Sequence, residues 1–426
     1  MANPLKLIEK IREGQLDDTL QWLYHDDIKR QKNRYCDAIK KYTTIYSESD
    51  DISLVTAPGR CEISGNHTDH QNGCVLAAAV TVDILVIASK TSDNTIHMNS
   101  EGYPPMDIDI TDLSLKPDEA NSSLALVRGI ASYFNQRQYI VGGANIYMIS
   151  DVPKGSGLSS SACFEVAVGS MLNVMYNDGS IDAIEIARAG KFAENVYFMK
   201  PSGFMDQTAC AVGGIVSIDF YDVNNPKIQR VDSSVMDNDY TLVVVNTGDS
   251  HANLSHMYAS IPNEMKEIAS FFSKEVLREL DEQQFYNSLS SLRGTVSDRA
   301  ILRAHHFFSE NKRVNEQIEA LTNKNMPLFA ELTRASGRSS SVYLQNIFPD
   351  DSLTERAIPL AIAISEMYLK DEGAYRVHGG GFAGTILSIV PEKMVDGYIN
   401  RMEELFNKGC CYRLRIRPVG GYFVAK

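Results

Sequence analysis

The chain of 426 residues is poor in cysteine and has no long apolar run. Its seven cysteines include the adjacent pair Cys410 and Cys411 but no CxxC pair. This usage disfavours a disulfide framework and a structural zinc site, and it favours a reducing compartment. No stretch approaches the roughly 18 apolar residues that cross a membrane, and residues 1–24 lack the apolar core of a signal peptide. We therefore expect a cytoplasmic protein with no membrane partner.

Positive charge is also scarce. The 41 Lys and Arg residues are outnumbered by 54 Asp and Glu residues, which gives a net charge of −13 at pH 7. This balance disfavours nonspecific binding to nucleic acid or to anionic membranes. It does not exclude phosphorylated ligands, because a local loop can bind an anion in an acidic protein. The chain is too long for one ordinary core, so we expect two domains.

Helical and strand-like patterns alternate along the chain, which predicts an α/β or α+β protein. Apolar residues spaced by three and four predict helices in residues 4–46, Ser122–Phe134, Ser159–Met175, Asp182–Phe198 and Asn263–Leu332. Strands are expected at Ser53–Ala57, Val75–Ala88, Asn145–Ile149, Gly214–Phe220, Leu242–Val245, Thr385–Val390, Tyr412–Arg417 and Tyr422–Ala425. The polar, turn-rich stretch Tyr221–Asp239 places the boundary between predicted domains 1–230 and 231–426.

A Gly/Ser-rich loop, Pro153–Ala162, follows an expected strand and precedes an apolar helix. Glycines let a backbone approach phosphate oxygens closely, and serine hydroxyls can cap a helix or bind phosphate or Mg²⁺. The free amides and the dipole at a helix N-terminus favour an anion. The loop lacks the GK[ST] of a Walker A motif and the third glycine of a dinucleotide fingerprint. A phosphate-binding loop and an ordinary Gly/Ser turn both fit this pattern.

A second polar segment lies between two strand-like runs. Its planar donors and acceptors suit the hydroxyls of a sugar or polyol. The His-x-Asp pair could also bind a metal, but two groups in one loop are too few to require one. A solvated loop with an internal Arg–Asp pair is the alternative, and the glycines at 59 and 65 favour a fixed shape. The polar residues of this segment are Arg60, Glu62, Asn66, His67, Asp69 and His70.

Two acidic residues and a glycine run complete the candidates. Glu194 lies in a largely apolar helical pattern, so it is either on the solvent face or a metal ligand. Asp206 could orient or deprotonate a substrate hydroxyl, or it could cap a helix. The run His378–Gly384 permits close approach of the backbone to a ligand, although a glycine-rich hairpin has the same pattern.

Taken in order, these motifs resemble those of the GHMP small-molecule kinases and, within them, the galactokinases. They run from about residue 53 to 390 in the family's order, which makes the combination far more specific than any one motif. The resembling segments are Ala57–Arg60 with Gly65–His70 (sugar signature), Gly155–Ala162 (second motif), Gly379–Gly384 (third motif), Met205–Gln207 (catalytic aspartate) and Ala193–Asn195 (Mg²⁺ ligand).

The resemblance implies an α+β fold of two domains, an N-terminal one like ribosomal protein S5 domain 2 and a C-terminal ferredoxin-like one, with the active site between them. It also implies ATP, Mg²⁺ and phosphorylation of a sugar, galactose, at its anomeric hydroxyl. Two alternatives stay open. One is a 1-kinase for a related sugar such as N-acetylgalactosamine or arabinose. The other is a catalytically idle sugar sensor, which the complete set of motifs disfavours.

The resemblance also implies roles for residues. Asp206 would be the base or the negative orienter of the hydroxyl, and Arg60 would keep it ionised. Ser161 and Glu194 would hold Mg²⁺, with Ser160 as a further candidate. The sugar would contact Arg60, Asn66, His67, Asp69, Gly203, Asp206 and Tyr258. The nucleotide phosphates would contact Gly155, Ser156, Gly157, Leu158, Ser159, Ser160 and Ser161.

Three positions depart from the family's pattern. Members usually carry Asn, Glu and Tyr where this chain has Glu62, Asn66 and His70. The loss of a carboxylate at 66 need not abolish sugar binding, because an amide oxygen also accepts hydrogen bonds. Either Glu62 partly substitutes for it, or the sugar differs at the hydroxyl that residue 66 contacts.

Overall fold

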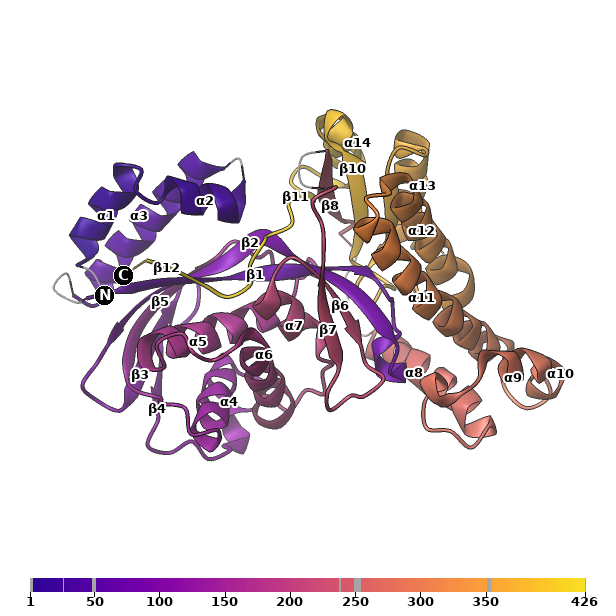
Figure 1. Cartoon of the computed structure of the whole chain (residues 1–426), viewed down its shortest axis with the longest axis horizontal. Coiled ribbons are helices and arrows are strands. Elements are labelled where there is room, and N and C mark those ends of the chain that lie inside the picture. Colours follow the sequence, from indigo (N-terminus) through magenta and orange to yellow (C-terminus); the bar gives the residue numbers. More distant parts are fainter. Residues whose placement is uncertain are drawn as a thin grey trace.

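The computed structural model describes residues 3–25, 27–47, 51–236, 239–248, 254–350 and 354–425. A long sheet runs through the middle of the molecule, with the first three helices on one side and α4–α7 on the other (Figure 1). A second sheet and the helices α8–α14 lie at the far end. The mixture of sheets and helices confirms the α+β expectation.

The helical expectation for residues 4–46 is confirmed as three helices, α1 (Pro4–Arg12), α2 (Asp17–Tyr24) and α3 (Ile28–Ile45). Gly14 and His25 separate them with φ angles of 84° and 59°, which an α-helix does not allow. Apolar side chains of all three helices pack against one face of the long sheet. This packing explains the apolar spacing of the segment.

The long sheet has eight strands within the described residues. Their order is β12-β1-β2-β5-β3-β4, and β6 pairs with β2 and β7. The strand β2 is central because its first half pairs with β6 and its second half with β5. The strands are β1 (Ser53–Ser64), β2 (Cys74–Lys90), β3 (Thr95–Ser100), β4 (Met106–Asp109), β5 (Ala144–Ser150), β6 (Ile215–Asp219), β7 (Lys227–Val231) and β12 (Tyr422–Ala425).

One strand lies where only turns were expected. The stretch Tyr221–Asp239 contains β7, which pairs with β6 along its whole length. Four of the five β7 residues are exposed or half-buried, so the strand has no apolar run to reveal it. The structure corrects this part of the prediction, and the division into domains 1–230 and 231–426 stays a prediction.

The inner face of the long sheet carries four helices, of which α4, α5 and α6 were expected from their apolar spacing and α7 was not. The helix α5 lies between the sheet and another helix, since it contacts β1 and β2 on one side and α6 on the other. A π-helical turn, Ala193–Tyr197, continues directly from α6. The helices are α4 (Ser123–Gln136), α5 (Ser160–Tyr176), α6 (Ala183–Phe192) and α7 (Met205–Val212).

The second sheet is antiparallel, in the order β11-β8-β10-β9. With its strands numbered along the chain this order is 4-1-3-2, which agrees with the expected ferredoxin-like arrangement. Its strands are β8 (Tyr240–Asn246), β9 (Ala374–His378), β10 (Thr385–Pro391) and β11 (Cys411–Leu414). The accompanying helices are α8 (Ser255–Phe271), α9 (Glu282–Asn287), α10 (Leu289–Leu292), α11 (Asp298–Thr322), α12 (Met326–Ser339), α13 (Ala357–Leu369) and α14 (Val395–Phe406).

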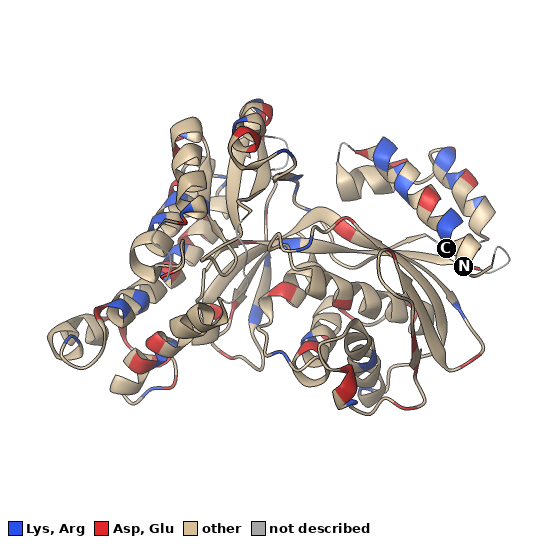
Figure 2. Ribbon diagram, turned by 180° about the vertical axis from the view of Figure 1, so that it is seen from behind, with Lys and Arg blue, Asp and Glu red and all other residues tan. Residues whose placement is uncertain are grey.

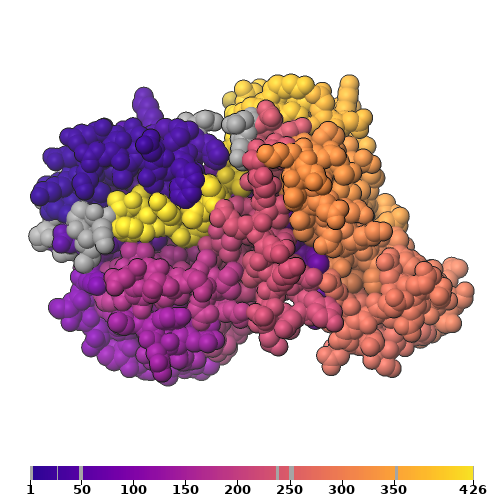
Figure 3. Space-filling view, in the orientation of Figure 1, coloured from indigo at the N-terminus to yellow at the C-terminus, as the bar shows by residue number. Residues whose placement is uncertain are grey.

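After β11 the chain returns to the first sheet. The last strand, β12, pairs with the start of β1, and its atoms lie between the N-terminal helices and the layer of α5 and α6 (Figure 3). The expected strand Tyr412–Arg417 is therefore shorter than predicted, because β11 ends at Leu414 and the chain then crosses between sheets.

Charged residues lie mostly on the helices and loops, and the strands carry few (Figure 2). No helix in the described ranges is long and apolar enough to cross a membrane. The seven cysteines are all described, and none forms a disulfide.

Candidate active site

The sugar-signature segment is half strand and half loop. Arg60 and Glu62 lie in β1, whose residues are all buried, and not in a turn as expected. The loop begins at Gly65, where φ is 91° and an added Cβ would stand 2.5 Å from the carbonyl oxygen of Cys74. Only glycine fits there. The sequence was misleading because alternating polar residues on a strand resemble a polar loop.

Arg60 connects the two halves of the site. Its Nε and Nη2 donate to Oδ1 and Oδ2 of Asp206, each at 2.7 Å. Its Nη1 donates to the carbonyl of Gly157 in the Gly/Ser loop. A bidentate guanidinium–carboxylate pair fixes both side chains in position, so Arg60 sets the distance between Asp206 and the loop.

The environment of Asp206 favours its charged form. Burial raises the pKa of this carboxyl, but the charge and hydrogen bonds of Arg60, together with the Ser159 hydroxyl, outweigh burial and lower the pKa below its usual value. Asp206 is the second residue of α7, and Phe204 occupies the N-cap position, so the alternative of a helix cap is wrong. Its side chain remains 33% exposed, enough to reach a ligand.

The Gly/Ser loop leads into the N-terminus of α5. Gly155 and Gly157 have φ angles of 69° and 72°, and a Cβ at Gly155 would meet nothing within 4 Å. The backbone at Gly155 is thus open to a ligand. Ser160 and Ser161, in the first turn of α5, have exposed side chains. Exposed hydroxyls at a helix N-terminus are well suited to bind phosphate or a metal ion.

Two residues of this loop point inward. Ser156 is buried and its hydroxyl donates to the carbonyl of Pro153 at 2.7 Å. Leu158 is buried in the main core. Both residues are almost fully buried, backbone included, so the structure does not expose these two expected phosphate contacts to a ligand.

Glu194 is not on a solvent face. Its side chain is 5% exposed and lies on the π-helical turn, a feature that is frequent at functional sites. Lys200 Nζ stands 2.9 Å from Oε1, and Gln207 Nε2 donates to Oε2 at 2.8 Å. Glu194 and Ser161 line the same cavity of about 180 Å³. Carboxylate and hydroxyl oxygens are ligands that Mg²⁺ accepts, and this ion needs only one or two protein ligands beside phosphate and water.

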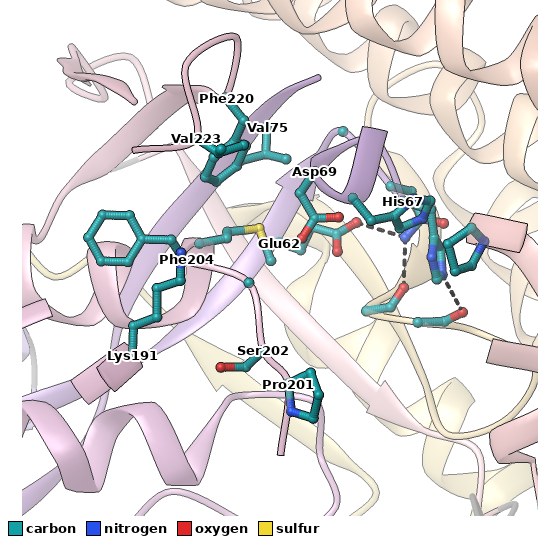
Figure 4. Close-up of a pocket in the computed structure, with 18 of the residues that line it drawn as sticks. Glu62, His67, Asp69, Val75, Lys191, Pro201, Ser202, Phe204, Phe220 and Val223 are labelled. Carbon is teal, nitrogen blue, oxygen red and sulfur yellow. Dashed lines mark hydrogen bonds between the residues drawn. The ribbon is translucent and has the colours of Figure 1, made fainter. Parts of the chain in front are cut away.

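A larger cavity of about 640 Å³ contains most of the predicted sugar contacts. Figure 4 shows Asp69 and Glu62 near its middle, His67 on one side, and Phe204, Phe220 and Val223 on the other. The predicted sugar contacts that line this cavity are Arg60, Asn66, His67, Asp69 and Gly203. The combination of polar groups with an apolar wall is usual for small-molecule sites.

Asn66 and Glu62 form one hydrogen-bonded unit beside this cavity. Asn66 Nδ2 donates to Glu62 Oε1 at 2.9 Å and to the carbonyl of Gly379 at 2.7 Å. Its Oδ1 accepts from Asn346 Nδ2 at 2.8 Å. Glu62 also pairs with the buried Arg376 at 3.0 Å. The Glu62 carboxylate thus contacts the Asn66 amide. Compared with the family's usual Asn at 62 and Glu at 66, the two residue types are exchanged, and the pair stays in contact.

Asp69 and Gly203 lie next to each other in the lining of the larger cavity. An added Cβ at Gly203 would stand 2.9 Å from Oδ2 of Asp69, so glycine leaves room for that carboxylate. Burial raises the pKa of Asp69, and the nearby Asp206 raises it further. His67 Nε2 lies 3.0 Å from the carbonyl of Gly380. A polar ligand between these groups would find both donors and acceptors.

His70 has unused hydrogen-bonding capacity. Both ring nitrogens are buried, and neither has a partner in the described part of the chain. The residue lines the larger cavity, and burial lowers its pKa to about 3. Among the described residues, His70 therefore carries two buried ring nitrogens without a partner next to this cavity.

Tyr258 is placed differently from the other predicted contacts. Its hydroxyl donates to the carbonyl of Gly381 at 2.9 Å, and its ring packs edge-on against Phe382. It is not among the residues that line either described cavity, and it contacts the Gly379–Gly384 loop. Tyr258 as a sugar contact therefore stays a prediction.

Several supporting residues were not identified from the sequence. Glu310 of α11 accepts from Ser64 Oγ and from the amide of Gly65 at 3.0 and 3.1 Å. His306 Nε2 lies 2.9 Å from the carbonyl of Asn66. Lys191 lines the cavity beside Phe204. None has a local motif, because their partners lie far away along the chain.

The comparisons with known proteins identify the family. The galactokinase galactose-binding signature matches residues 40–90, and the GHMP kinases N terminal domain matches residues 125–214. A galactokinase of Actinobacillus pleuropneumoniae serotype 3 is 30% identical over 360 residues, covering 84% of this chain and 90% of that protein.

Solved structures show the same fold. Lactococcus lactis galactokinase, complexed with galactose, superposes with a TM-score of 0.75 at 22% identity, covering 90% of this chain and 98% of that one. Methanococcus jannaschii mevalonate kinase gives a TM-score of 0.63 at 14% identity, covering 86% and 98%. The motifs, their arrangement and these relatives lead to one conclusion: the chain belongs to the galactokinase family of the GHMP kinases.

Proposed function

We propose that this protein is a galactokinase, which transfers the terminal phosphoryl group of ATP to the anomeric C1 hydroxyl of D-galactose and yields galactose 1-phosphate and ADP. The observation that carries the proposal is the Arg60–Asp206 pair. It lies where the polar cavity meets the Gly/Ser loop, since Arg60 lines that cavity and also donates to Gly157. A carboxylate at this junction can touch both the sugar hydroxyl and the region of the phosphate.

Each group has a defined task in this proposal. Asp206, held ionised by Arg60, accepts the hydrogen bond of the C1 hydroxyl and either removes its proton or orients it toward the phosphorus. Asn66, His67, Asp69 and Gly203 position the sugar. The amides and hydroxyls at the start of α5 position the phosphates. Because phosphoryl transfer depends mainly on positioning and charge stabilisation, these tasks account for most of the chemistry.

Mg²⁺ would be held by Ser161 and Glu194, with Ser160 adjacent. When bound, the ion would neutralise charge on the phosphate oxygens. The oxygen donors fit this ion, and no cluster of three or more His, Cys, Asp or Glu residues that would suit another metal occurs in the described ranges. A cytoplasmic location fits an ATP-dependent reaction and remains a proposal.

A second candidate is a 1-kinase for N-acetylgalactosamine. The apolar wall of the larger cavity favours it, because Val75, Phe220 and Val223 could pack against an acetyl methyl group. The same wall could instead contact only the apolar face of galactose. The specificity must therefore be measured.

A coupled ADP-release assay with Mg·ATP separates the possibilities. The panel contains D-galactose, N-acetylgalactosamine, L-arabinose, D-glucose and a control without sugar. We expect turnover with galactose far above the others. Faster turnover with N-acetylgalactosamine would support the proposed mechanism but would show that N-acetylgalactosamine, not galactose, is the substrate. ATP binding without turnover of any sugar would contradict the kinase proposal and favour a sugar sensor.

A further inference from the structure

A lysine contacts the carboxylate that is proposed to hold the metal. Lys200 Nζ lies 2.9 Å from Glu194 Oε1, and the Lys200 side chain is 59% exposed. The backbone amide of Lys200 also donates to the carbonyl of Glu194 at 3.1 Å. This backbone bond holds the Lys200 Cα close to Glu194, while the stem and head reach the carboxylate from the solvent side.

The two oxygens of Glu194 are held in different ways. Oε2 accepts from Gln207, whose Nε2 also donates to the buried Glu165 at 3.0 Å. That amide is fixed inside the protein. Within the described part of the chain, Oε1 is paired only with the ammonium of Lys200. Oε1 is therefore the oxygen whose present partner can leave without disturbing the core.

The ammonium group lies in the space that substrates would share. Lys200, Ser161, Glu194 and Asp206 line one cavity of about 180 Å³. A buried carboxylate without a cation is costly, so some positive charge must balance Glu194 before a metal binds. A divalent ion and an ammonium at the same oxygen would repel each other, so the two cannot both remain there.

We propose that Lys200 exchanges partners during the catalytic cycle. In the nucleotide-free protein its ammonium neutralises Glu194. With Mg·ATP bound, Glu194 would hold the ion, and the Lys200 ammonium would move within the same cavity to contact the phosphate oxygens. A flexible stem with a compact charged head suits this movement. The inference rests on the proposed kinase function, because it assigns the nucleotide to this cavity.

Metal binding in the absence of turnover tests the first part of the proposal, that Lys200 neutralises Glu194 in the nucleotide-free protein. Lys200→Met keeps the stem and removes the charge, and Lys200→Gln serves as a second neutral variant should the first fold poorly. Free Mn²⁺, followed by electron paramagnetic resonance without nucleotide, is the probe. We expect both variants to bind Mn²⁺ on the order of tenfold more tightly than the unchanged protein. Lys116→Met is the matched control, because Lys116 forms an ion pair with Asp112 at 3.3 Å outside the site.

Steady-state kinetics test the second part of the proposal, that the Lys200 ammonium contacts the phosphate oxygens when Mg·ATP is bound. We expect kcat with Mg·ATP and the best sugar to fall about tenfold in Lys200→Met, with Lys200→Arg restoring most of it. Unchanged or weaker Mn²⁺ binding would overturn the proposal, and so would tighter Mn²⁺ binding with an unchanged kcat. If the unchanged protein phosphorylated no sugar, the kinase function would fail. The Mn²⁺ comparison would still test the competition at Glu194.

Discussion

Asp206 holds its charge against burial because Arg60 and Ser159 both donate to it. We predict that Asp206→Asn lowers kcat at least about a hundredfold, the low end of acid–base contributions. Nucleotide affinity should be retained, since Asn keeps the shape of the side chain. Single-turnover assays and equilibrium ATP binding measure the two quantities, with the exposed Asp109→Asn as control. Turnover near that of the unchanged protein would remove Asp206 from the mechanism.

Arg60 determines the pH range over which Asp206 is ionised. Its charge lowers the pKa of Asp206, whereas burial raises it. We predict that Arg60→Ala strongly lowers kcat and moves the acidic limb of the pH–rate profile to higher pH, because the carboxyl then binds its proton more readily. The profile of residual activity and a circular dichroism spectrum check this. Normal activity would mean that the Arg60 pair is only structural.

Glu62 and Asn66 should be coupled, because their side chains touch. Asn66→Glu alone would place two carboxylates together and remove the donor to Gly379. We expect it to weaken sugar binding by about 1–3 kcal/mol. The double exchange Glu62→Asn with Asn66→Glu should recover most of that loss, with a coupling energy on the order of 1–3 kcal/mol. Sugar dissociation constants for the four proteins measure it, and additive effects would contradict the idea that Glu62 substitutes for a carboxylate at 66.

At the scale of elements, long apolar runs were the most predictable. The strands β2, β8 and β10 and the helices α4 and α5 have such runs, and they lie within a few residues of their predicted positions. The strand β7 was missed because only one of its five residues is buried. The elements β3, β4, β9, α7, α13 and α14 were not assigned either, although β9 is fully buried. Pairing with a neighbour, rather than local pattern, makes β7 a strand.

The site was predictable where its residues are consecutive. Arg60, the Gly/Ser loop and Asp206 belong to short motifs, and the structure brings them together. Residues of distant elements that hold the site residues in place were not predictable. Arg376 reaches Glu62 across the junction of the two sheets, and no local pattern announces such a contact. The sugar contact of Tyr258, assigned by resemblance, stays a prediction, since the structure shows this residue only in contact with the Gly379–Gly384 loop.

The helix α11 supports the sugar loop through Glu310. This buried carboxylate accepts from Ser64 and Gly65 and pairs with Arg313. We predict that Glu310→Gln lowers the free energy of unfolding by about 3 kcal/mol and raises the KM for sugar more than the KM for ATP. Urea denaturation and steady-state kinetics measure these changes, with the exposed Glu316→Gln as control. Equal changes in both KM values would argue against a specific role for the loop.

At the scale of the whole molecule, Asp83 joins three distant segments. Arg34 of α3 and Arg417 near the chain's end contact its carboxylate at 2.6 and 2.7 Å, and Tyr24 and Thr56 donate to it as well. Burial raises the pKa of Asp83, but the two arginines outweigh burial and lower it to about 2. The N-terminal helices, the long sheet and the return of the chain thus share one buried acid.

This acid predicts how stability depends on pH. The folded pKa is about 2, and the unfolded value is about 3.9, so the stabilisation is complete above about pH 4 and is lost as pH falls toward 2. We expect Asp83→Asn to lose about 3–5 kcal/mol at neutral pH and to flatten the change of unfolding free energy between about pH 4 and 2. Urea denaturation across this range checks it, and an unchanged acid dependence would contradict the assignment.

The pairing of β12 with β1 has a consequence for biosynthesis. Val55 and Thr56 pair with Phe423 and Tyr422. A ribosome makes these two partners after nearly all the rest of the described chain. Until β12 is made, one edge of β1 lacks its partner strand. This is the same strand that carries Arg60. An open strand edge invites pairing with other chains. We therefore expect this enzyme to need protection from aggregation in the interval between synthesis of β1 and release of β12.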